Sequence, residues 1–294
     1  MRPDLPPTER RLPDSLDLDR ADSLGVLRLL HEQDIVAARS LEPLLPAIAR
    51  LVDEAATRMR RGGRVHYFGA GTSGRLGVLD AAELLPTYNL EPGRIVPHIA
   101  GGDAAIVNAV ENAEDSRAEG AEAAAEVGPD DVAIGLTASG TTPYVAAALE
   151  VARAHGAFTA LVSSNPDSPI GRQVDIDLAL DTGPEVVTGS TRLKAGTAQK
   201  LVLNGFSTAL MVALGRTWSN LMVSVVATND KLRRRSVRIL SEATGLDEDA
   251  AREALAAAGG DLKVAIVAHL LGAPVAEAAD RLAAANGSVR DAIR

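Results

Sequence analysis

Cysteine is absent from this 294-residue chain, and aromatic residues are scarce, with one Trp, three Tyr and three Phe. The lack of thiols excludes disulfides, thiolate catalysis and cysteine-ligated zinc or iron–sulfur sites. So few rings leave little surface on which nucleic-acid bases could stack. The 39 acidic residues outnumber the 30 Lys and Arg, which gives a net charge of −9 and argues against nucleic acid or an anionic membrane as the main partner. Any anionic ligand must therefore be held by local donors.

Long hydrophobic runs are missing as well. The sequence has no run of 18 apolar residues, so it predicts no membrane-spanning helix. The N-terminal segment MRPDLPPTERRLPDSLDLDR has no apolar core of a signal peptide, and we expect a cytoplasmic protein. The histidines show no metal-ligand spacing, and no metal or redox cofactor is expected. They lie at positions 31, 66, 98, 155 and 269.

The middle of the chain alternates short apolar runs with Ala-rich helical segments. The apolar runs predict strands at 64–69, 94–100, 131–137, 158–163 and 174–180. The segments between and after them predict helices at 74–84, 104–113, 143–155 and 193–214. This alternation indicates βαβ units, and hence an α/β fold whose parallel sheet is covered by helices on both faces.

Both ends of the chain have helical patterns. After an extended Pro-rich arm over 1–20, leucine spacing between 22 and 61 predicts two helices, with the break at Pro43 and Pro46. Beyond 229, glycines fall where helices are expected to stop, at Gly245, Gly259, Gly272 and Gly287. We expect three regions: an N-terminal arm with helices over 1–55, the α/β domain over 56–228, and a small helical domain over 229–294.

Glycine and hydroxyl residues follow the first predicted strand. The segment GAGTSG at 69–74 fits the GxGxxG pattern of a dinucleotide site. Such a site also needs an acidic residue at the end of the second strand, and the nearest candidate, Asp103, comes late for that role. A dinucleotide is therefore the less favoured interpretation.

A second loop of the same chemistry, TASGTT at 137–142, follows the third predicted strand and precedes Pro143, which suits a first helical turn. Backbone N–H groups at a helix start, together with hydroxyls, can hold phosphate without net positive charge. One such loop could be an ordinary turn with a cap. Two at the same sheet edge favour phosphate. A third polar segment, 183–200, contains Lys194 and Lys200, two of the four lysines.

Longer strings around these loops resemble known proteins. The loop pair resembles a sugar isomerase (SIS) phosphosugar-binding domain. From about Thr8 to the C-terminus the chain resembles the N-acetylmuramic acid 6-phosphate etherases, in the strings GAGTSGRLGVLDAAELLPTY, AGGDAAIVNAVENAEDS, ASGTTPYV, GPEVVTGSTRLKAGTAQKLVLN and NLMVSVVATNDKL. Segment 183–200 is also similar to the glucokinase regulatory protein. The resemblance implies a flavodoxin-like αβα sandwich with N-terminal helices and a small C-terminal domain similar to the ubiquitin-associated (UBA) fold.

The resemblance implies a lyase without a cofactor. Such etherases convert N-acetylmuramic acid 6-phosphate to N-acetylglucosamine 6-phosphate and D-lactate. The open-chain aldehyde acidifies the C2 proton; its removal expels lactate from C3, and water then adds there. Elimination of this kind needs one ionised and one protonated carboxyl group. By resemblance these are Glu114 and Glu83. Apolar neighbours would raise the pKa of Glu83 and favour it as proton donor, with Glu114 as base.

The three polar segments supply the substrate-binding candidates. Ser73, Ser139 and Thr142 are expected to cap helices and to hold the 6-phosphate. The complete set also includes neighbouring hydroxyl and charged side chains: Thr72, Ser73, Ser139, Thr141, Thr142, Glu185, Ser190 and Lys194.

Two other functions stay open. An SIS isomerase would also need a base at C2 but would release no lactate, and a non-catalytic sugar-phosphate sensor would bind without turnover. We also expect a homodimer with a shared site. If a helix starts near Gly74, Glu83 lies about 14 Å along it and could serve a neighbour's sugar. The alternative is that the helix ends early and turns Glu83 back into its own pocket.

Overall fold

The computed structural model describes residues 5–225 and 230–294. The chain divides into two compact units, one comprising the residues up to Ala81 with Gly93–Ser207, and the other Ala82–Pro92 with Thr208–Arg294. The chain passes from one unit to the other within helices α3 (Gly71–Tyr88) and α7 (Lys194–Ala213), and also between Pro92 and Gly93. The expected boundary between 228 and 229 lies outside the described residues.

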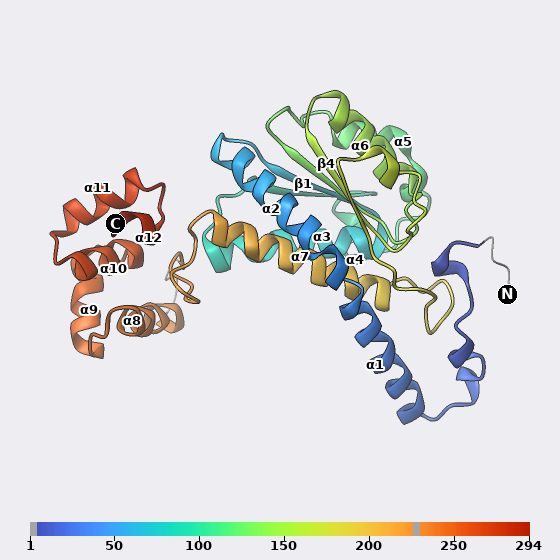
Figure 1. The fold of residues 1–294 in the computed structure, drawn as a ribbon, viewed down its shortest axis with the longest axis horizontal. Coiled ribbons are helices and arrows are strands. Elements are labelled where there is room, and N and C mark those ends of the chain that lie inside the picture. Colours follow the sequence, from blue (N-terminus) through green and yellow to red (C-terminus); the bar gives the residue numbers. More distant parts are fainter. Residues whose placement is uncertain (1–4, 226–229) are drawn as a thin grey trace. The chain divides into compact units, whose positions relative to one another are not determined.

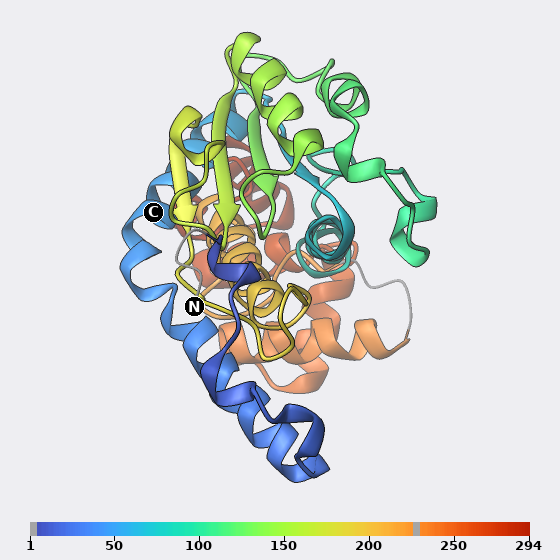
Figure 2. The same cartoon turned by 90° about the vertical axis from the view of Figure 1, so that its right-hand side faces the viewer.

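The first unit is built on a five-stranded parallel sheet, in the order β2-β1-β3-β4-β5. All five expected strands are present: β1 (Val65–Gly69), β2 (Ile95–Ile99), β3 (Val132–Leu136), β4 (Phe158–Ser163) and β5 (Ile176–Ala179). Every residue of β1 and β3 is buried, as expected for central strands covered on both faces. Figure 2 shows the arrowheads of the green and yellow strands pointing the same way.

Helices cover both faces of the sheet (Figure 1). On one face, Phe68 of β1 and Leu161 of β4 pack with Tyr144, Val145 and other apolar residues of α6 (Pro143–Ala154), beside α5 (Arg117–Ala123). On the other face, the Tyr67 hydroxyl donates to Asp80 of α3 at 3.0 Å. The αβα sandwich that the sequence predicts is therefore confirmed.

Asp80 connects α3 to α7 within the first unit. Its carboxylate accepts hydrogen bonds from Ser207 at 2.9 Å and Asn204 at 3.1 Å, in addition to Tyr67. Burial raises the pKa of Asp80, and the three donors oppose that rise. These contacts hold α7 against the face of the sheet that α3 covers.

Most of the helices between the strands follow the expected ranges, but one does not. The segment 104–113 was expected to be one helix, whereas α4 ends after one turn (Ala104–Val107). Asn108 is extended and Asn112 has a left-handed φ of 62° before the short turn Ala113–Asp115. The helix α5 was not expected at all. The prediction over 104–113 is therefore wrong.

The N-terminal helices agree with the sequence. The helix α1 spans Ser23–Arg39 and α2 spans Leu45–Arg60, and Pro43 and Pro46 lie at the break and in the first turn of α2. Residues Ile48, Leu51 and Val52 of α2 are buried, and α2 packs against β5. By contrast, Leu24 and Leu27 of α1 are 53% and 62% exposed.

The second unit is helical beyond Asp230. Its helices are α8 (Asp230–Thr244), α9 (Glu248–Ala257), α10 (Leu262–Leu271), α11 (Val275–Ala284) and α12 (Val289–Ala292). The expected stops are confirmed, because each of the four glycines has a φ between 61° and 79°, a conformation that other residues rarely adopt. The similarity to a UBA fold stays a prediction.

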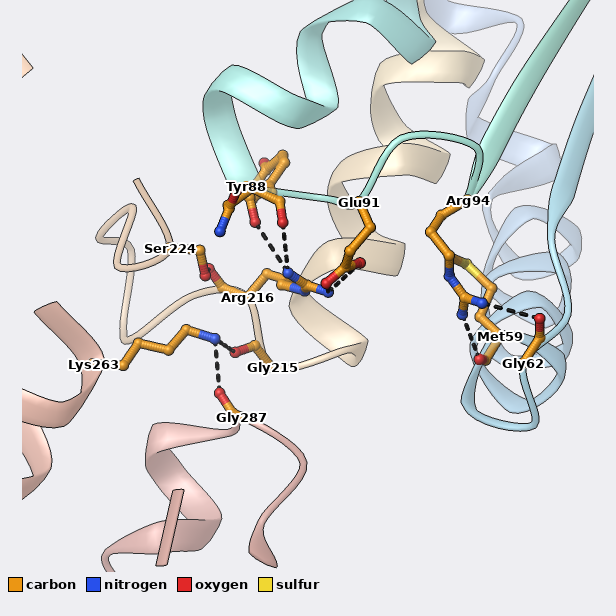
Figure 3. A network of polar contacts seen from close by, with 11 residues as sticks. Met59, Gly62, Tyr88, Glu91, Arg94, Gly215, Arg216, Ser224, Lys263 and Gly287 are labelled. Atoms are coloured by element: carbon orange, nitrogen blue, oxygen red, sulfur yellow. Dashed lines mark hydrogen bonds and ion pairs between the residues drawn. The ribbon is translucent and has the colours of Figure 1, made fainter. Parts of the chain in front are cut away.

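Lys263 of α10 joins three parts of this second unit (Figure 3). Its ammonium donates to the carbonyl of Gly215 at 3.1 Å and to that of Gly287 at 2.7 Å. Burial and the nearby Arg216 lower its pKa to about 8. Arg216 in turn forms two 3.0 Å bonds to the Glu91 carboxylate.

Among the described residues, no single helix is long and apolar enough to cross a membrane. The pair α9 and α10 together passes that criterion of length and composition, but the two helices are bent by 108°.

Candidate functional site

The two glycine-hydroxyl loops lie side by side at the carboxyl edge of the sheet. The first follows β1 and the second follows β3, and these strands are direct neighbours with Gly69 opposite Leu136. The expectation that both loops share one edge is thereby confirmed. In parallel sheets this edge is where ligands bind.

The glycines of the first loop allow the strand end and the helix start to touch. A Cβ on Gly69 would lie 2.8 Å from Cα of Gly74, and a Cβ on Gly74 would lie 2.8 Å from the Gly69 carbonyl oxygen. Neither position tolerates a side chain, because both neighbours are backbone atoms. The glycine pattern here therefore has a packing cause, whichever ligand binds.

Ser73 is buried in the first turns of α3 and does not cap the helix. Its hydroxyl donates to Oε1 of Gln199 on α7 at 2.9 Å. The amide nitrogen of Gln199 is buried without a partner among the described residues. Thr72 lies close to α7 as well, since a Cβ on Gly196 would be 3.5 Å from the Thr72 methyl group. The first loop thus faces α7.

The second loop is a cluster of hydroxyls. The Thr137 hydroxyl lies 2.7 Å from that of Thr142 and 3.2 Å from that of Ser139. The Ser139 hydroxyl accepts from the backbone N–H and the hydroxyl of Thr141, at 3.2 and 3.1 Å. Thr142 occupies the N-cap position of α6 but makes no side-chain capping bond. The expected capping role is therefore wrong for all three: Ser73 lies inside α3, Ser139 precedes the N-cap position of α6, and Thr142 makes no capping bond.

The third polar segment closes over the start of α7. Glu185 is buried, and its two oxygens accept from the backbone N–H groups of Lys194 and Ala195 at 3.1 and 3.0 Å. Burial raises the pKa of Glu185, and these two N–H groups oppose the rise. Lys194 is 2% exposed and donates to Gln33 of α1 at 2.5 Å. Burial lowers the pKa of Lys194, opposed by the Glu185 carboxylate.

Residues of the third polar segment differ in how accessible they are to a ligand. Both oxygens of Glu185 are occupied by α7, whereas Ser190 is half-buried and its backbone N–H donates to the Val187 carbonyl at 2.9 Å. A substrate contact by Glu185, Ser190 or Lys194 stays a prediction.

Glu114 lines a cavity of about 230 Å³ in the first unit, beside the first loop. Gly71 and Arg75 line the same cavity from the α3 side, and Glu111 and Val110 line it from the segment before Glu114. The Glu114 side chain is exposed. The structure therefore places the expected base next to one of the two hydroxyl loops, open to an incoming ligand.

Glu83 lies on α3 in the second unit, and its side chain is exposed. The helix continues past it to Tyr88, so the alternative in which α3 ends early is wrong. Of its leucine neighbours, Leu84 is buried, whereas Leu79 and Leu85 are 53% and 49% exposed. Among the described residues, the apolar surroundings that were expected to bury Glu83 are therefore only partly present.

Some polar residues of this region were not anticipated from the sequence. Gln199 bonds to Ser73, and Asn165, after β4, donates from its amide to the Ser139 carbonyl at 2.8 Å. Each is a single amide far from its partner in sequence, so no local motif marks it. Among the described residues, no three His, Asp or Glu side chains are grouped so that they could hold a metal ion.

Two domain families match the chain. The SIS domain matches residues 106–209, and the glucokinase regulatory protein N-terminal SIS domain matches residues 47–153. A phosphoheptose isomerase from Francisella tularensis has a TM-score of 0.51 at 21% identity, covering 65% of this chain and 98% of its own, which shows a shared fold. The fold and its paired loops thus define an SIS-domain protein.

Curated proteins of known name are more similar to this chain in sequence than that structure is. N-acetylmuramic acid 6-phosphate etherase of Thermobifida fusca is 53% identical over 90% of this chain and 87% of its own. The protein of that name from Deinococcus radiodurans is 49% identical over 97% of this chain and 94% of its own, and the one from Klebsiella aerogenes is 48% identical over 97% and 96%. The chain belongs to the N-acetylmuramic acid 6-phosphate etherase family.

Proposed function

We propose that this protein is a lyase that cleaves the D-lactyl ether of N-acetylmuramic acid 6-phosphate, giving N-acetylglucosamine 6-phosphate and D-lactate. The observation that carries this proposal is the 53% identity to a curated etherase over 90% of the chain. The SIS-domain match agrees with a phosphorylated sugar as substrate. The reaction belongs to amino-sugar catabolism and to the recycling of cell-wall sugar.

The proposed chemistry is an elimination followed by an addition. Opening of the sugar ring exposes the C1 aldehyde, which acidifies the C2 proton. A carboxylate removes this proton, the C3–oxygen bond breaks, and a carboxylic acid protonates the departing D-lactate oxygen. Water then adds to C3 of the unsaturated aldehyde. The carbon skeleton of the sugar and its phosphate are unchanged.

Glu114 is the proposed base. Its side chain is exposed in the cavity beside the first loop, where it can reach a bound sugar. The hydroxyls of Thr72, Ser73, Ser139, Thr141 and Thr142 are proposed to hold the 6-phosphate, with Ser190, Lys194 and Glu185 completing the site. The first two loops lie at adjacent strand ends, which supports a common ligand.

Glu83 is the proposed acid, and a second subunit is proposed to bury it. A general acid must be protonated near neutral pH, and burial of a carboxyl group favours its protonated form. Covering Leu79 and Leu85, which are about half exposed, would desolvate Glu83. We therefore propose a homodimer in which Glu83 of one subunit completes the site of its neighbour.

The functional division of the chain is also part of the proposal. Residues 56–228 form the phosphosugar-binding domain, preceded by the N-terminal arm and helices over 1–55 and followed by the helical domain over 229–294. We propose a cytoplasmic location, where a phosphorylated sugar would be encountered.

The direct test is to incubate the protein with N-acetylmuramic acid 6-phosphate and to measure D-lactate and N-acetylglucosamine 6-phosphate. The proposal predicts equal amounts of both. An isomerase would convert sugar phosphate without releasing D-lactate, and a sensor would bind the sugar without consuming it. Either result would overturn the proposed reaction.

A further inference from the structure

Arg75 is a half-buried arginine in the second turn of α3, and its hydrogen-bond partners among the described residues are neutral carbonyl groups. Its Nε donates to the Ile106 carbonyl at 3.0 Å and its Nη2 donates to the Asn108 carbonyl at 2.8 Å. Among the described residues, no carboxylate forms an ion pair with it. A guanidinium has five N–H donors, so these two bonds leave the Nη1 donors for another acceptor.

Arg75 also places a positive charge at the cavity that Glu114 lines. Of the described residues that line this cavity of about 230 Å³, one is basic, Arg75, and two are acidic, Glu111 and Glu114. A substrate that carries a phosphate and a carboxylate would be repelled by the two glutamates. The fixed positive charge of Arg75 offsets that repulsion inside the cavity.

The geometry points to Arg75 as the residue that binds the carboxylate of the substrate's D-lactyl group. This inference rests on the proposed function, since it assigns a subsite for the group that the reaction removes. Planar guanidinium and carboxylate groups match in shape and charge, and their hydrogen bonds are among the strongest in proteins.

The substrate has two anionic groups, the lactyl carboxylate and the 6-phosphate, and the position of Glu114 favours the carboxylate as the partner of Arg75. A base in this cavity acts at C2, and the lactyl ether is attached to the next carbon, C3. The lactyl carboxylate is therefore separated from the reacting carbon by fewer bonds than the phosphate on C6. The phosphate in turn has the hydroxyl loops at the ends of β1 and β3 as its proposed site.

Binding of the lactyl carboxylate by Arg75 would also affect which sugar phosphates the site prefers. The product sugar lacks the lactyl group, so Arg75 would distinguish substrate from product. It would also counter the negative charge that gathers on the departing lactate, whose oxygen lies next to its own carboxylate. An isomerase substrate without a lactyl group would gain nothing from such an arginine.

The test compares three ligands by calorimetry: N-acetylmuramic acid 6-phosphate, its analogue with the lactyl carboxylate replaced by a carboxamide, and N-acetylglucosamine 6-phosphate. Binding is measured in a Glu114→Gln background, which prevents turnover. Adding Arg75→Gln is expected to weaken binding of the acid about 10- to 150-fold, the range for one charge-assisted hydrogen bond. Binding of the carboxamide and of the product sugar should change less than about threefold.

Arg94 provides the matched control. It also donates to two backbone carbonyls, those of Gly62 at 3.0 Å and Met59 at 2.6 Å (Figure 3). It precedes β2, at the opposite edge of the sheet from the hydroxyl loops. Arg94→Gln should leave all three affinities unchanged.

Several outcomes would overturn the assignment. Equal weakening of all three ligands by Arg75→Gln would mean that Arg75 acts on the phosphate or only fixes the segment 106–108, and unchanged binding of the acid would remove it from the site. If Arg75→Gln does not fold, as judged by circular dichroism, Arg75→Lys takes its place, since it keeps the positive charge. The ratio of the affinities for the acid and the carboxamide should then be smaller in Arg75→Lys than in the Glu114→Gln protein that retains Arg75. Failure of the wild-type protein to release D-lactate would instead refute the proposed function, while the calorimetric comparison would still decide the carboxylate subsite.

Discussion

Nδ1 of His66 lies 3.0 Å from Nε2 of His98, with His66 buried inside the sheet on β1 and His98 opposite Phe68 on the neighbouring strand β2. The rings of His98 and Phe68 are stacked with centroids 4.6 Å apart. Burial, together with the neighbouring His98, lowers the pKa of His66 to about 4, although Asp131 opposes this. Burial, with Arg64 nearby, lowers the pKa of His98 to about 4, opposed by Glu126.

This pair predicts that the first unit loses stability in mild acid. Between about pH 6.5 and pH 4 the unfolded chain protonates both histidines while the folded one does not, so the free energy of unfolding falls as the pH falls. The loss is on the order of 2–3 kcal/mol for each histidine. Replacing His98 by Phe should keep the stacking and reduce the slope of unfolding free energy against pH by about half.

Urea unfolding at several pH values between 4.5 and 7 checks this prediction. Replacement of His31, which is exposed on α1, by Gln serves as the control and should retain the wild-type slope. An undiminished slope in the His98→Phe protein would show that the histidine pair is not the cause.

Ser139→Ala tests the phosphate site. Loss of one hydrogen bond to a charged phosphate is expected to raise KM about 10- to 150-fold with a smaller effect on kcat. Thr57→Val is the control, because its hydroxyl bonds within α2 to the Asp53 carbonyl, and it should leave both constants unchanged. If Ser139→Ala has wild-type KM and kcat, Ser139 does not bind the substrate.

Replacing Glu83 or Glu114 by Gln is expected to block different steps of the reaction. Glu83→Gln should stop D-lactate release but still allow exchange of the C2 proton with solvent, because Glu114 remains as base. Glu114→Gln should abolish both. Deuterium incorporation at C2 by NMR and D-lactate release together separate the two steps.

Glu111→Gln is the matched control for the base, since Glu111 is an exposed glutamate that lines the same cavity. It should keep both lactate release and C2 exchange. The reverse pattern in the Glu83 and Glu114 variants would show that Glu83 is the base and Glu114 the acid. Full activity in either Gln variant would rule out the two-acid mechanism.

Mixed dimers decide whether the site is shared. When Glu83→Gln chains are combined with Ser139→Ala chains, a shared site gives one intact and one doubly damaged pocket in each mixed dimer. Activity should therefore return on mixing, to about half of the wild-type value per mixed dimer. If each chain builds its own site, both pockets carry a lesion and mixing restores nothing.

The sequence predicted the sheet well because its signals are local. Each strand is a short apolar run, and glycines mark the helix ends in the C-terminal region, where Gly245 and Gly272 have the left-handed φ that a stop requires. The hydroxyl loops were also located correctly, since they follow directly from the ends of β1 and β3.

The errors arise where distant residues replace local bonds. In place of a helix over 104–113, the backbone is extended at Asn108, and the carbonyls of Ile106 and Asn108 accept hydrogen bonds from Arg75. Ser73 does not cap α3 because the helix begins earlier, at Gly71, and its hydroxyl instead donates to Gln199, 126 positions away. The sequence also predicted apolar burial of Glu83, whereas its neighbours Leu79 and Leu85 are about half exposed.

The most direct test of the proposed chemistry is to run the reaction in water enriched in oxygen-18 and to analyse both products by mass spectrometry. Elimination breaks the bond between C3 and the ether oxygen, so D-lactate keeps that oxygen and water supplies the new hydroxyl at C3. Elimination followed by water addition predicts label at C3 of N-acetylglucosamine 6-phosphate and none in D-lactate. Label in the hydroxyl of D-lactate would contradict it, because water would then have attacked the lactyl carbon instead.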